Sequence, residues 1–432
     1  MSPTLTGIIG IGVLLIVLFS RIPIGAGMAL VGFAGFAYLS GIGPALGLLR
    51  QVPFEFFSEY NLSVVPLFIL MGAFAMTAGL SEDLYRVAYK WLGHLKGGLA
   101  MATVGACAFF AAISGSSVAT AATMATVALP EMRKYNYAPS LATGCIAAGG
   151  SIGILIPPSV ILIIYGIIAE QSIGKLFLAG FIPGVLEAVF YIFTIVVLMK
   201  IDPSLGPRGS QTSLREKATA LFGVWEVMLL FLCVIGGIYL GVFTPTEAAG
   251  VGSFGAFLFA ILRKRLTWPN FKHSVVDTTK NTGMVFIIIM GAMILGYFLS
   301  ITRLPFEMAG FIAELPVNRY VILVLILLLL TMLGCIMDSM AIVLLTVPIF
   351  FPVILRLNFD PIWFGILIVR VTEMGLITPP VGINVYIIKG ISNEPMGTIF
   401  RGVFPFIIAD ILHIALLMAV PQITLFLPGM MK

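Results

Sequence analysis

Apolar segments alternate with short polar ones along the whole chain. Many of the apolar segments approach the ~20 residues that a helix needs to cross a bilayer. They lie near residues 5–20, 23–41, 61–80, 175–200, 221–241, 245–262, 281–300 and 401–428. A polar linker at 201–220, rich in Pro, Gly, Ser and charge, separates them into two groups. The pattern predicts an all-α polytopic membrane protein with one half in residues 1–200 and the other in 221–432.

Each half also contains apolar segments that small residues or prolines interrupt. They predict hydrophobic hairpins at 98–130 and 319–355, and broken helices at 139–170 and 361–390. The segment Gly153-Ile154-Leu155-Ile156-Pro157-Pro158-Ser159 corresponds to Gly375-Leu376-Ile377-Thr378-Pro379-Pro380-Val381, 222 positions later. Paired broken helices at matching places in two halves indicate the binding site of a secondary transporter.

The span count predicts that the second half is inverted in the membrane. A re-entrant hairpin adds no net crossing, so about five crossings remain in each half, with scaffold spans in 1–80 and 221–300. An odd number of crossings turns the second half upside down. Lys and Arg then gather on the face that holds the linker, which predicts that this face is cytoplasmic and that both termini are periplasmic. The segments 44–60 and 304–318 are predicted to lie along the interface.

Composition supports a membrane protein and excludes several other classes. The chain is 60% hydrophobic and 10% charged, whereas soluble domains carry about 25% charged residues. A net charge of +5 reflects the bias of the loops and does not indicate nucleic acid. The N-terminus has no basic lead, so we expect a retained first span. The four cysteines lie in apolar segments without metal-ligand spacing, and no cofactor is predicted.

The first hairpin and the first break together predict a cation site. The hairpin turns at 114–117, with hydroxyls at Ser114 and Ser117. Non-helical backbone at membrane depth is tolerated only where it is buried or lines a cavity, and prolines free the carbonyls one turn before them. The main-chain oxygens of Gly153, Ile156 and Pro157 are therefore expected to face the two serines. The alternative is a tight turn that only packs helices.

The second copy places a carboxylate where the first has a hydroxyl. Asp338 corresponds to Ser116, and a carboxylate inside a membrane is a functional candidate by default because it is costly to bury. Thr378 and the carbonyls of Gly375 and Val381 are its predicted partners in a second cation site. The alternative is that Asp338 caps the second arm of its hairpin.

Other polar residues are assigned by their position relative to the breaks. The predicted solute-binding residues are Ser116, Ser159, Ser339 and Asn384. Arg370 and Glu373 are three residues apart on one helix, which predicts that they pair with each other. The remaining ionisable residues within the spans are expected at span ends or in packing faces; they are Glu187, Glu226, Glu247, Asp410 and His413.

At these motifs the chain resembles the large membrane subunit of tripartite ATP-independent periplasmic (TRAP) transporters, over essentially its whole length. The motifs that carry the resemblance are residues 66–72, 114–120, 153–159 with Tyr165-Gly166, 176–180 with Pro183-Gly184, and 373–384. Together, in this order and spacing, they are highly specific.

The resemblance implies an elevator-type secondary transporter that uses Na⁺ to import a small organic acid such as sialic acid or a C4-dicarboxylate. It implies a location in the bacterial inner membrane and two partners. The partners are a small four-helix membrane subunit and a soluble periplasmic substrate-binding protein. It also implies two Na⁺ sites. They consist of Ser114, Ser117, Gly153, Ile156 and Pro157, and of Ile336, Asp338, Gly375, Thr378 and Val381.

Two other functions compete with this one. A related elevator carrier of dicarboxylates that needs no binding protein has the same architecture, and only the family motifs favour the tripartite transporter. An intramembrane hydrolase using Ser116 or Ser117 needs a base within reach, but neither hairpin core contains His or Lys. No ATP-binding Gly-x-x-x-x-Gly-Lys-Ser/Thr motif is present. The sequence therefore predicts a transporter that is neither an enzyme nor an ATP-driven pump.

Overall fold

Helices make up all the regular structure that is described. The computed structural model describes residues 1–20, 22–314 and 316–431, which confirms the predicted all-helical polytopic fold. Of the described helices, six are long and apolar enough to cross a membrane: Tyr60–Thr77, Ile173–Ile201, Pro245–Leu262, Trp268–Thr302, Ser339–Arg356 and Met396–Ala419. Other predicted spans, such as α1 (Pro3–Phe19) and α2 (Ile24–Ser40), are 17 residues long, so the number of crossings stays a prediction.

Helices of the two halves begin at matching positions. α7 (Ser117–Lys134) and α18 (Ser339–Arg356) are 222 residues apart at both ends. α8 (Pro139–Ile152) and α19 (Pro361–Gly375) start with the same offset, and a non-helical break follows each of them. The repeat in the sequence is thus a repeat in the order of helices, while the inversion of one half relative to the membrane stays a prediction.

The remaining helices follow the same order. In the first half they are α3 (Ile42–Ser58), η1 (Tyr60–Ser63), α4 (Val64–Thr77), α5 (Leu80–Leu92), α6 (Gly98–Ser114), α9 (Val160–Ile168) and α10 (Ile173–Ile201). The linker holds η2 (Pro203–Leu205) and the start of α11 (Leu214–Phe222). In the second half they are α12 (Trp225–Phe231), a π-helical turn (Leu232–Gly236), α13 (Gly237–Tyr239), α14 (Pro245–Leu262), α15 (Trp268–Thr302), α16 (Leu304–Glu314), α17 (Arg319–Gly334), α20 (Ile383–Ser392), α21 (Met396–Ala419) and α22 (Gln422–Met430).

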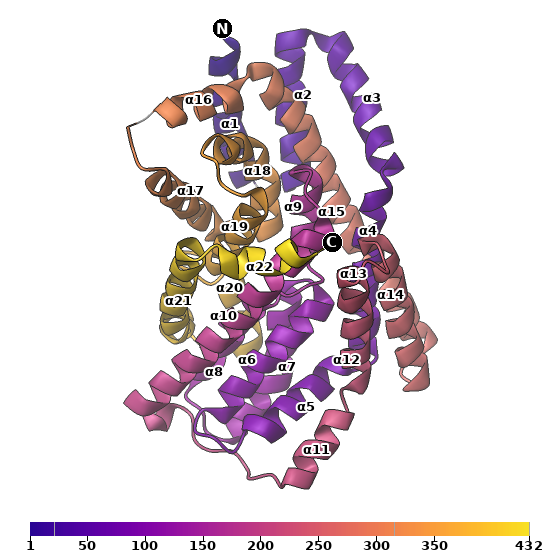
Figure 1. Ribbon diagram of the computed structural model, residues 1–432, viewed down its shortest axis with the longest axis vertical. Helices are drawn as coiled ribbons and strands as arrows, with labels where there is room; N and C mark the ends of the chain where they lie inside the picture. Colours follow the sequence, from indigo (N-terminus) through magenta and orange to yellow (C-terminus); the bar gives the residue numbers. More distant parts are fainter. Residues whose placement is uncertain (21, 315, 432) are drawn as a thin grey trace.

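α15 is the longest of the described helices and runs beside α2 and α3 (Figure 1). It runs for 35 residues, well beyond the predicted span at 281–300. α2 packs along it at close range: a side chain at Gly32 would meet the backbone of Leu295 at 2.7 Å, and Gly25 lies directly against Gly291. Small residues permit this approach of two backbones in a membrane helix pair.

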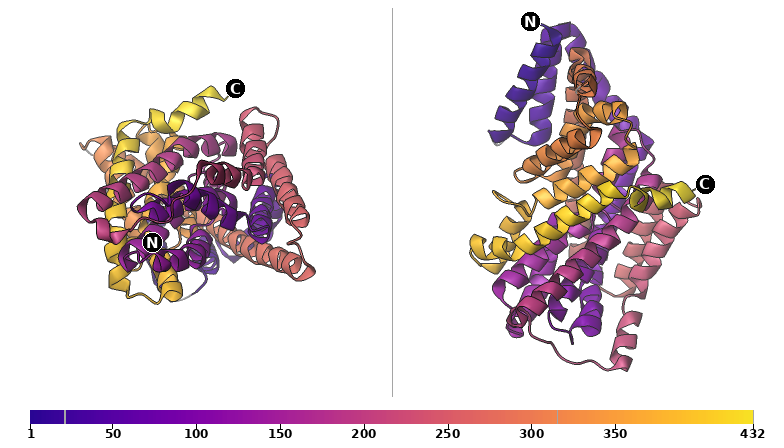
Figure 2. Two further views of the ribbon diagram at one scale, coloured as in Figure 1. Left: turned by 90° about the horizontal axis from the view of Figure 1, so that it is seen from below. Right: turned by 60° about the vertical axis from the view of Figure 1, so that its left-hand side comes forward.

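The hairpins and broken helices of the two halves interleave. α8 contacts α21 at Gly144 and Gly402, which leave no room for side chains. The Tyr165 hydroxyl of α9 donates a hydrogen bond to the Pro361 carbonyl of α19 at 2.5 Å, and Arg133 donates to the Ser392 carbonyl. Figure 2 shows the yellow α21 lying against the magenta and purple helices of the first half. These elements therefore form one packed body drawn from both halves.

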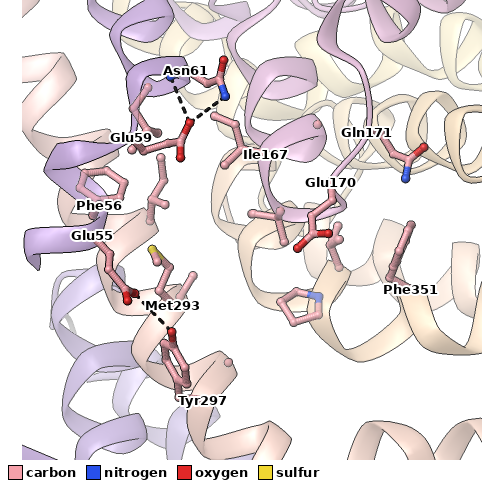
Figure 3. Close-up of a pocket in the computed structure, with 18 of the residues that line it drawn as sticks. Glu55, Phe56, Glu59, Asn61, Ile167, Glu170, Gln171, Met293, Tyr297 and Phe351 are labelled. Carbon is pink, nitrogen blue, oxygen red and sulfur yellow. Dashed lines mark hydrogen bonds between the residues drawn. The ribbon is translucent and has the colours of Figure 1, made fainter. Parts of the chain in front are cut away.

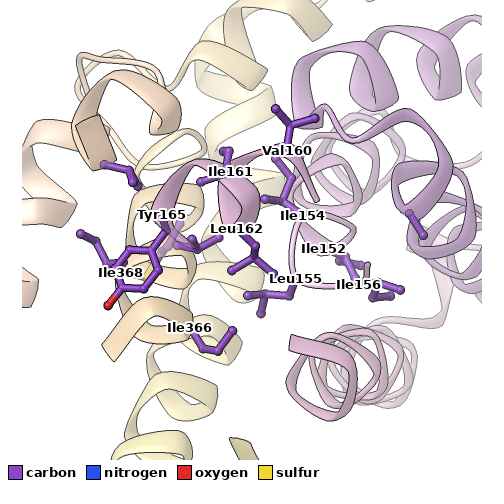
Figure 4. Close-up of a cluster of buried hydrophobic side chains, with 14 of the residues drawn as sticks. Ile152, Ile154, Leu155, Ile156, Val160, Ile161, Leu162, Tyr165, Ile366 and Ile368 are labelled. Carbon is purple, nitrogen blue, oxygen red and sulfur yellow. The ribbon is translucent and has the colours of Figure 1, made fainter. Parts of the chain in front are cut away.

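The first break lies inside the apolar core of that body (Figure 4). Ile154, Leu155 and Ile156 precede the two prolines and are at most 7% exposed. Ile366 and Ile368 of α19 lie in the same buried cluster. Non-helical backbone is thus held within protein, as a break at membrane depth requires.

Candidate functional site

The tip of the first hairpin is a turn held by hydroxyl groups. Gly115 ends α6 in a left-handed conformation (φ +63°), which glycine adopts at little cost. Ser116 then caps α7 by accepting a hydrogen bond from the Ala119 amide at 3.3 Å. Thr120, which the sequence analysis did not single out, donates to the Ser116 carbonyl at 2.8 Å and lies 2.9 Å from the Ser114 hydroxyl.

The first break lies against this tip. A side chain at Gly115 would contact Val160 at 3.2 Å, and one at Gly150 would lie 3.0 Å from the Ser117 carbonyl. Ser159 caps α9 through its hydroxyl, which accepts from the Leu162 amide at 3.4 Å. The structure therefore places the hairpin beside the break, as the sequence analysis predicted for these two elements. Which carbonyls bind an ion stays a prediction.

The tip of the second hairpin carries the carboxylate. Asp338 is the N-cap of α18, and its side chain accepts from the Met340 amide at 3.1 Å. The capping role weighed in the sequence analysis is therefore present. A carboxylate can accept further bonds beside this one, so a role in ion binding is compatible with the cap.

The second break is bonded directly to the second hairpin. The Gly382 amide donates to the Cys335 carbonyl at 3.3 Å, and Gly375 packs on Gly334. The Thr378 hydroxyl donates to the Met374 carbonyl at 2.6 Å, so its oxygen keeps lone pairs for a further ligand. Pro379 and Pro380 are exposed, unlike the buried prolines of the first break.

A cavity of about 560 Å³ brings the two hairpin tips together. Ser114, Ser116 and Ser117 line it from the first hairpin, and Asp338 lines it from the second. The volume falls within the range of small-molecule sites, about 300–1,000 Å³. Residues more than 200 positions apart thus share one wall, in a space that could hold a small solute.

The opposite wall is a polar stripe on α15, defined by Asn270, His273, Ser274, Asp277, Thr278 and Asn281. The spacing of three and four residues places them on one helix face. His273 Nδ1 lies 3.0 Å from Asp277 Oδ2, and the Ser274 hydroxyl is 2.9 Å from that of Thr77. This stripe was not predicted from the sequence, although its periodicity is visible in the first half of α15.

A second cavity, of about 840 Å³, lies farther along α15 (Figure 3). The C-terminal part of α15 lines it with Tyr297, and the region of α3 and η1 contributes Glu55 and Glu59. The turn after α9 contributes Glu170, and α18 contributes Phe351. It contains none of the predicted ion or solute residues. The first cavity, although smaller, is therefore the candidate site.

Comparison with known proteins identifies the family of this chain. Residues 11–423 match the family described as "Tripartite ATP-independent periplasmic transporter, DctM component". The chain is also 35% identical to the C4-dicarboxylate TRAP transporter large permease protein DctM of Pseudomonas aeruginosa, over 87% of this chain and 88% of that protein. This chain belongs to the DctM family of TRAP transporter large permeases. The resemblance stated from the motifs is confirmed.

Other similarities agree with this TRAP permease assignment. The sialic acid TRAP transporter large permease protein SiaM of Vibrio cholerae is 33% identical, over 95% of this chain and 96% of that protein. In three dimensions the chain is similar to MtrF of Neisseria gonorrhoeae, described among a class of antimetabolite efflux pumps. The TM-score is 0.62 at 13% identity, covering 89% of this chain and 85% of that one. This similarity concerns the fold alone.

Several predicted site residues of the permease lie away from the cavity wall. Ser159 and Ser339 are fully buried, and Asn384 is buried with its amide 3.4 Å from the Ala147 carbonyl. The lining of the cavity also omits every predicted ligand in the two breaks: Gly153, Ile156, Pro157, Gly375, Thr378 and Val381, together with Ile336 before Asp338. Of the first break, Ile154 lines the cavity, and the roles of the predicted ligands stay predictions.

The predicted pairing of Arg370 with Glu373 in this permease is wrong. Arg370 forms ion pairs with Glu187 of α10 and Asp410 of α21. The reason is geometric: the guanidinium points to carboxylates on two neighbouring helices, a competition that spacing along one helix cannot reveal. Glu373 instead lies near the hydroxyls of Ser117 and Ser339, between the two hairpins.

Proposed function

We propose that this TRAP large permease is the transport subunit of a Na⁺-coupled secondary transporter that imports a small organic acid of the sialic acid or C4-dicarboxylate type. The observation that carries the proposal is the cavity where Ser114, Ser116 and Ser117 meet Asp338. Relatives named for both kinds of solute align over most of the chain, which supports this range of solutes.

The chemistry of the two breaks suits Na⁺. A hard cation prefers carbonyl, hydroxyl and carboxylate oxygens. Ser114, Ser117 and the carbonyls of Gly153, Ile156 and Pro157 would hold the first ion. Asp338 with Thr378 and the carbonyls of Ile336, Gly375 and Val381 would hold the second. Cations beside the hairpin tips would also favour an anionic solute in a cavity that contains Asp338 and Asp277.

Movement would follow the elevator scheme. Different stretches of α15 line the two cavities. Residues up to Val285 line the first cavity, and residues from Ile289 onward line the second. A body made of the hairpins and broken helices, shifting along α15, would pass the solute from one cavity to the other. The tight packing of α2 on α15 suits α15 for the fixed part. Ser116 would contact the solute in the first cavity, whereas Ser159, Ser339 and Asn384, which are buried here, would contact it only after the shift opens their surroundings.

The proposal includes partners and a location. A small four-helix membrane subunit would pack on the scaffold helices, and a soluble periplasmic binding protein would deliver the solute. The complex would lie in a bacterial inner membrane, with both termini of this chain in the periplasm. Exposed apolar residues on α1, such as Ile8 and Ile16, suit contact with lipid or the small subunit.

Uptake into proteoliposomes tests the proposal. Vesicles holding this chain and its small subunit would receive radiolabelled sialic acid or a C4-dicarboxylate, with and without the binding protein and an inward Na⁺ gradient. We expect uptake of one solute that requires both. Equal uptake without the gradient would contradict Na⁺ coupling. Uptake without the binding protein would instead support a stand-alone carrier.

A further inference from the structure

A group of ionisable side chains is sealed inside the packed body. Arg370 Nη2 of α19 lies 3.3 Å from Glu187 Oε1 of α10 and forms a closer ion pair with Asp410 of α21. Its Nε donates to His413 Nδ1 at 3.2 Å. All four side chains have no exposed surface. We call these four residues, together with Tyr191, the Arg370 cluster.

The cluster carries more negative than positive charge. His413 is neutral, because its Nδ1 accepts the hydrogen bond from Arg370 and so holds no proton. Tyr191, beside Asp410 and Glu187, adds no positive charge. One guanidinium therefore faces two carboxylates. An uncompensated charge in the interior of a membrane protein is strongly unfavourable, so another positive charge is needed.

We propose that the Arg370 cluster is a proton-binding site, in which Glu187 and Asp410 share one proton that is exchanged with the cavity through Glu373. A proton suits the site better than a hydrated cation, because no residue of the cluster lines either cavity. The bound proton makes the cluster neutral. The transporter then carries a proton site separate from its two proposed Na⁺ sites.

Glu373 provides the connection. It lies on α19, three residues after Arg370, and its side chain is buried. Neither of its carboxylate oxygens has a hydrogen-bond partner among the residues that the structure describes. The hydroxyls of Ser117 and Ser339 and the charges of Asp338 and Glu187 act on this carboxyl group, and Ser117 and Asp338 also line the cavity. Chains of buried carboxylates of this kind form proton relays in membrane proteins.

The proton reaches the cluster in two transfer steps. A hydronium ion in the cavity gives up a proton to the Glu373 carboxylate, which forms an O–H bond, and water remains. Glu373 then passes the proton to a carboxylate oxygen of Glu187 or Asp410 and becomes ionised again. The cluster changes from a net charge of −1 to zero, and no other reactant is needed.

Infrared spectroscopy of the purified permease with its small subunit tests the proton site. We expect a protonated-carboxyl band at neutral pH that loses intensity in Asp410→Asn and in Glu187→Gln, and that is unchanged in the control Glu247→Gln at the exposed start of α14. Either cluster variant is sufficient if the other does not fold. A wild-type spectrum without this band, or a band that both cluster variants leave intact, would overturn the proton site.

Hydrogen–deuterium exchange of the same band tests the relay. In Glu373→Gln the shift of the cluster band after transfer to D₂O should be at least tenfold slower than in wild type. Equal exchange rates would remove Glu373 from the route and leave only the site. These measurements require no solute, Na⁺ or binding protein, so their failure is distinct from a failure of the proposed transport function.

Discussion

Each half contains one hairpin followed by one broken helix, which we call a unit. The two units have the same order of helices but different side chains at their tips and breaks. In the first unit the tip is neutral, Thr120 ties it together, and the break is buried in the apolar core. In the second unit Asp338 replaces Ser116, the residue matching Thr120 is Ile342, and the prolines of the break are exposed. The first unit therefore offers only dipoles to a cation, whereas the second adds a fixed charge.

This difference separates structural from electrostatic roles. Both tips begin a helix with a capping side chain, at Ser116 and at Asp338. Loss of a cap should cost similar stability in each. Loss of charge is possible only in the second, so substitutions at matched positions isolate the contribution of the carboxylate to coupling.

The largest expected effect concerns packing that both units share. In Gly375→Val the new side chain would meet the Gly334 backbone, and in Gly153→Val it would meet Ala111. Overpacking against backbone should cost about 3 kcal/mol, the upper end of the usual range, so neither variant should yield a monodisperse peak in size-exclusion chromatography. Gly105→Ala on α6, where nothing lies within 4 Å, is the control and should behave as wild type. Normal yield of Gly375→Val alone would show that the second unit is looser than the first.

A smaller effect is expected from the charge itself. Asn caps helices as well as Asp does, so Asp338→Asn should keep its fold while the Na⁺ concentration for half-maximal uptake rises at least tenfold, about 1.4 kcal/mol. Ser116→Asn, at the matched position of the first tip, should change this concentration by less than about threefold, or ~0.65 kcal/mol. Uptake assays in proteoliposomes over a range of Na⁺ measure both. Equal effects in the two variants would abolish the proposed difference between the units.

The smallest effect concerns the hydroxyl network of the first tip. Thr120→Val removes its bonds to Ser116 and Ser114 and should lower the free energy of unfolding by about 1 kcal/mol. Thr346→Val on α18 loses only a bond to a carbonyl of its own helix, that of Ile342, and should cost less than about 0.5 kcal/mol. Thermal denaturation followed by fluorescence compares them. A larger loss for Thr346→Val would show that the network does not hold the first tip.

Sequence patterns predicted the parts of the site that depend on local chemistry. The double prolines at 157–158 and 379–380 interrupt helices, and the structure has non-helical segments at 153–159 and 376–382, while α6 ends and α7 begins within the small residues 114–117. Asp338 was found because a lone carboxylate in an apolar stretch is conspicuous. The cap that it forms followed from its place at the start of a helix.

Other features depend on which helices become neighbours, which one sequence does not specify. Arg370 has a nearby acid on its own helix, yet it pairs with acids on α10 and α21. The polar stripe of α15 has helical periodicity, but its function as a cavity wall depends on the hairpin tips opposite it. Asn384 is polar and close to a break, yet packing directs it toward Ala147 and not toward the cavity.

The interleaving of the two halves has a consequence for biosynthesis. Gly144 fits against Gly402, and Tyr165 bonds to the carbonyl of Pro361, so helices made early complete their contacts only with helices made last. While the ribosome is still translating the second half, α8 and α9 lack their partners from that half. The first half can therefore complete its packing only after α19 and α21 have been made.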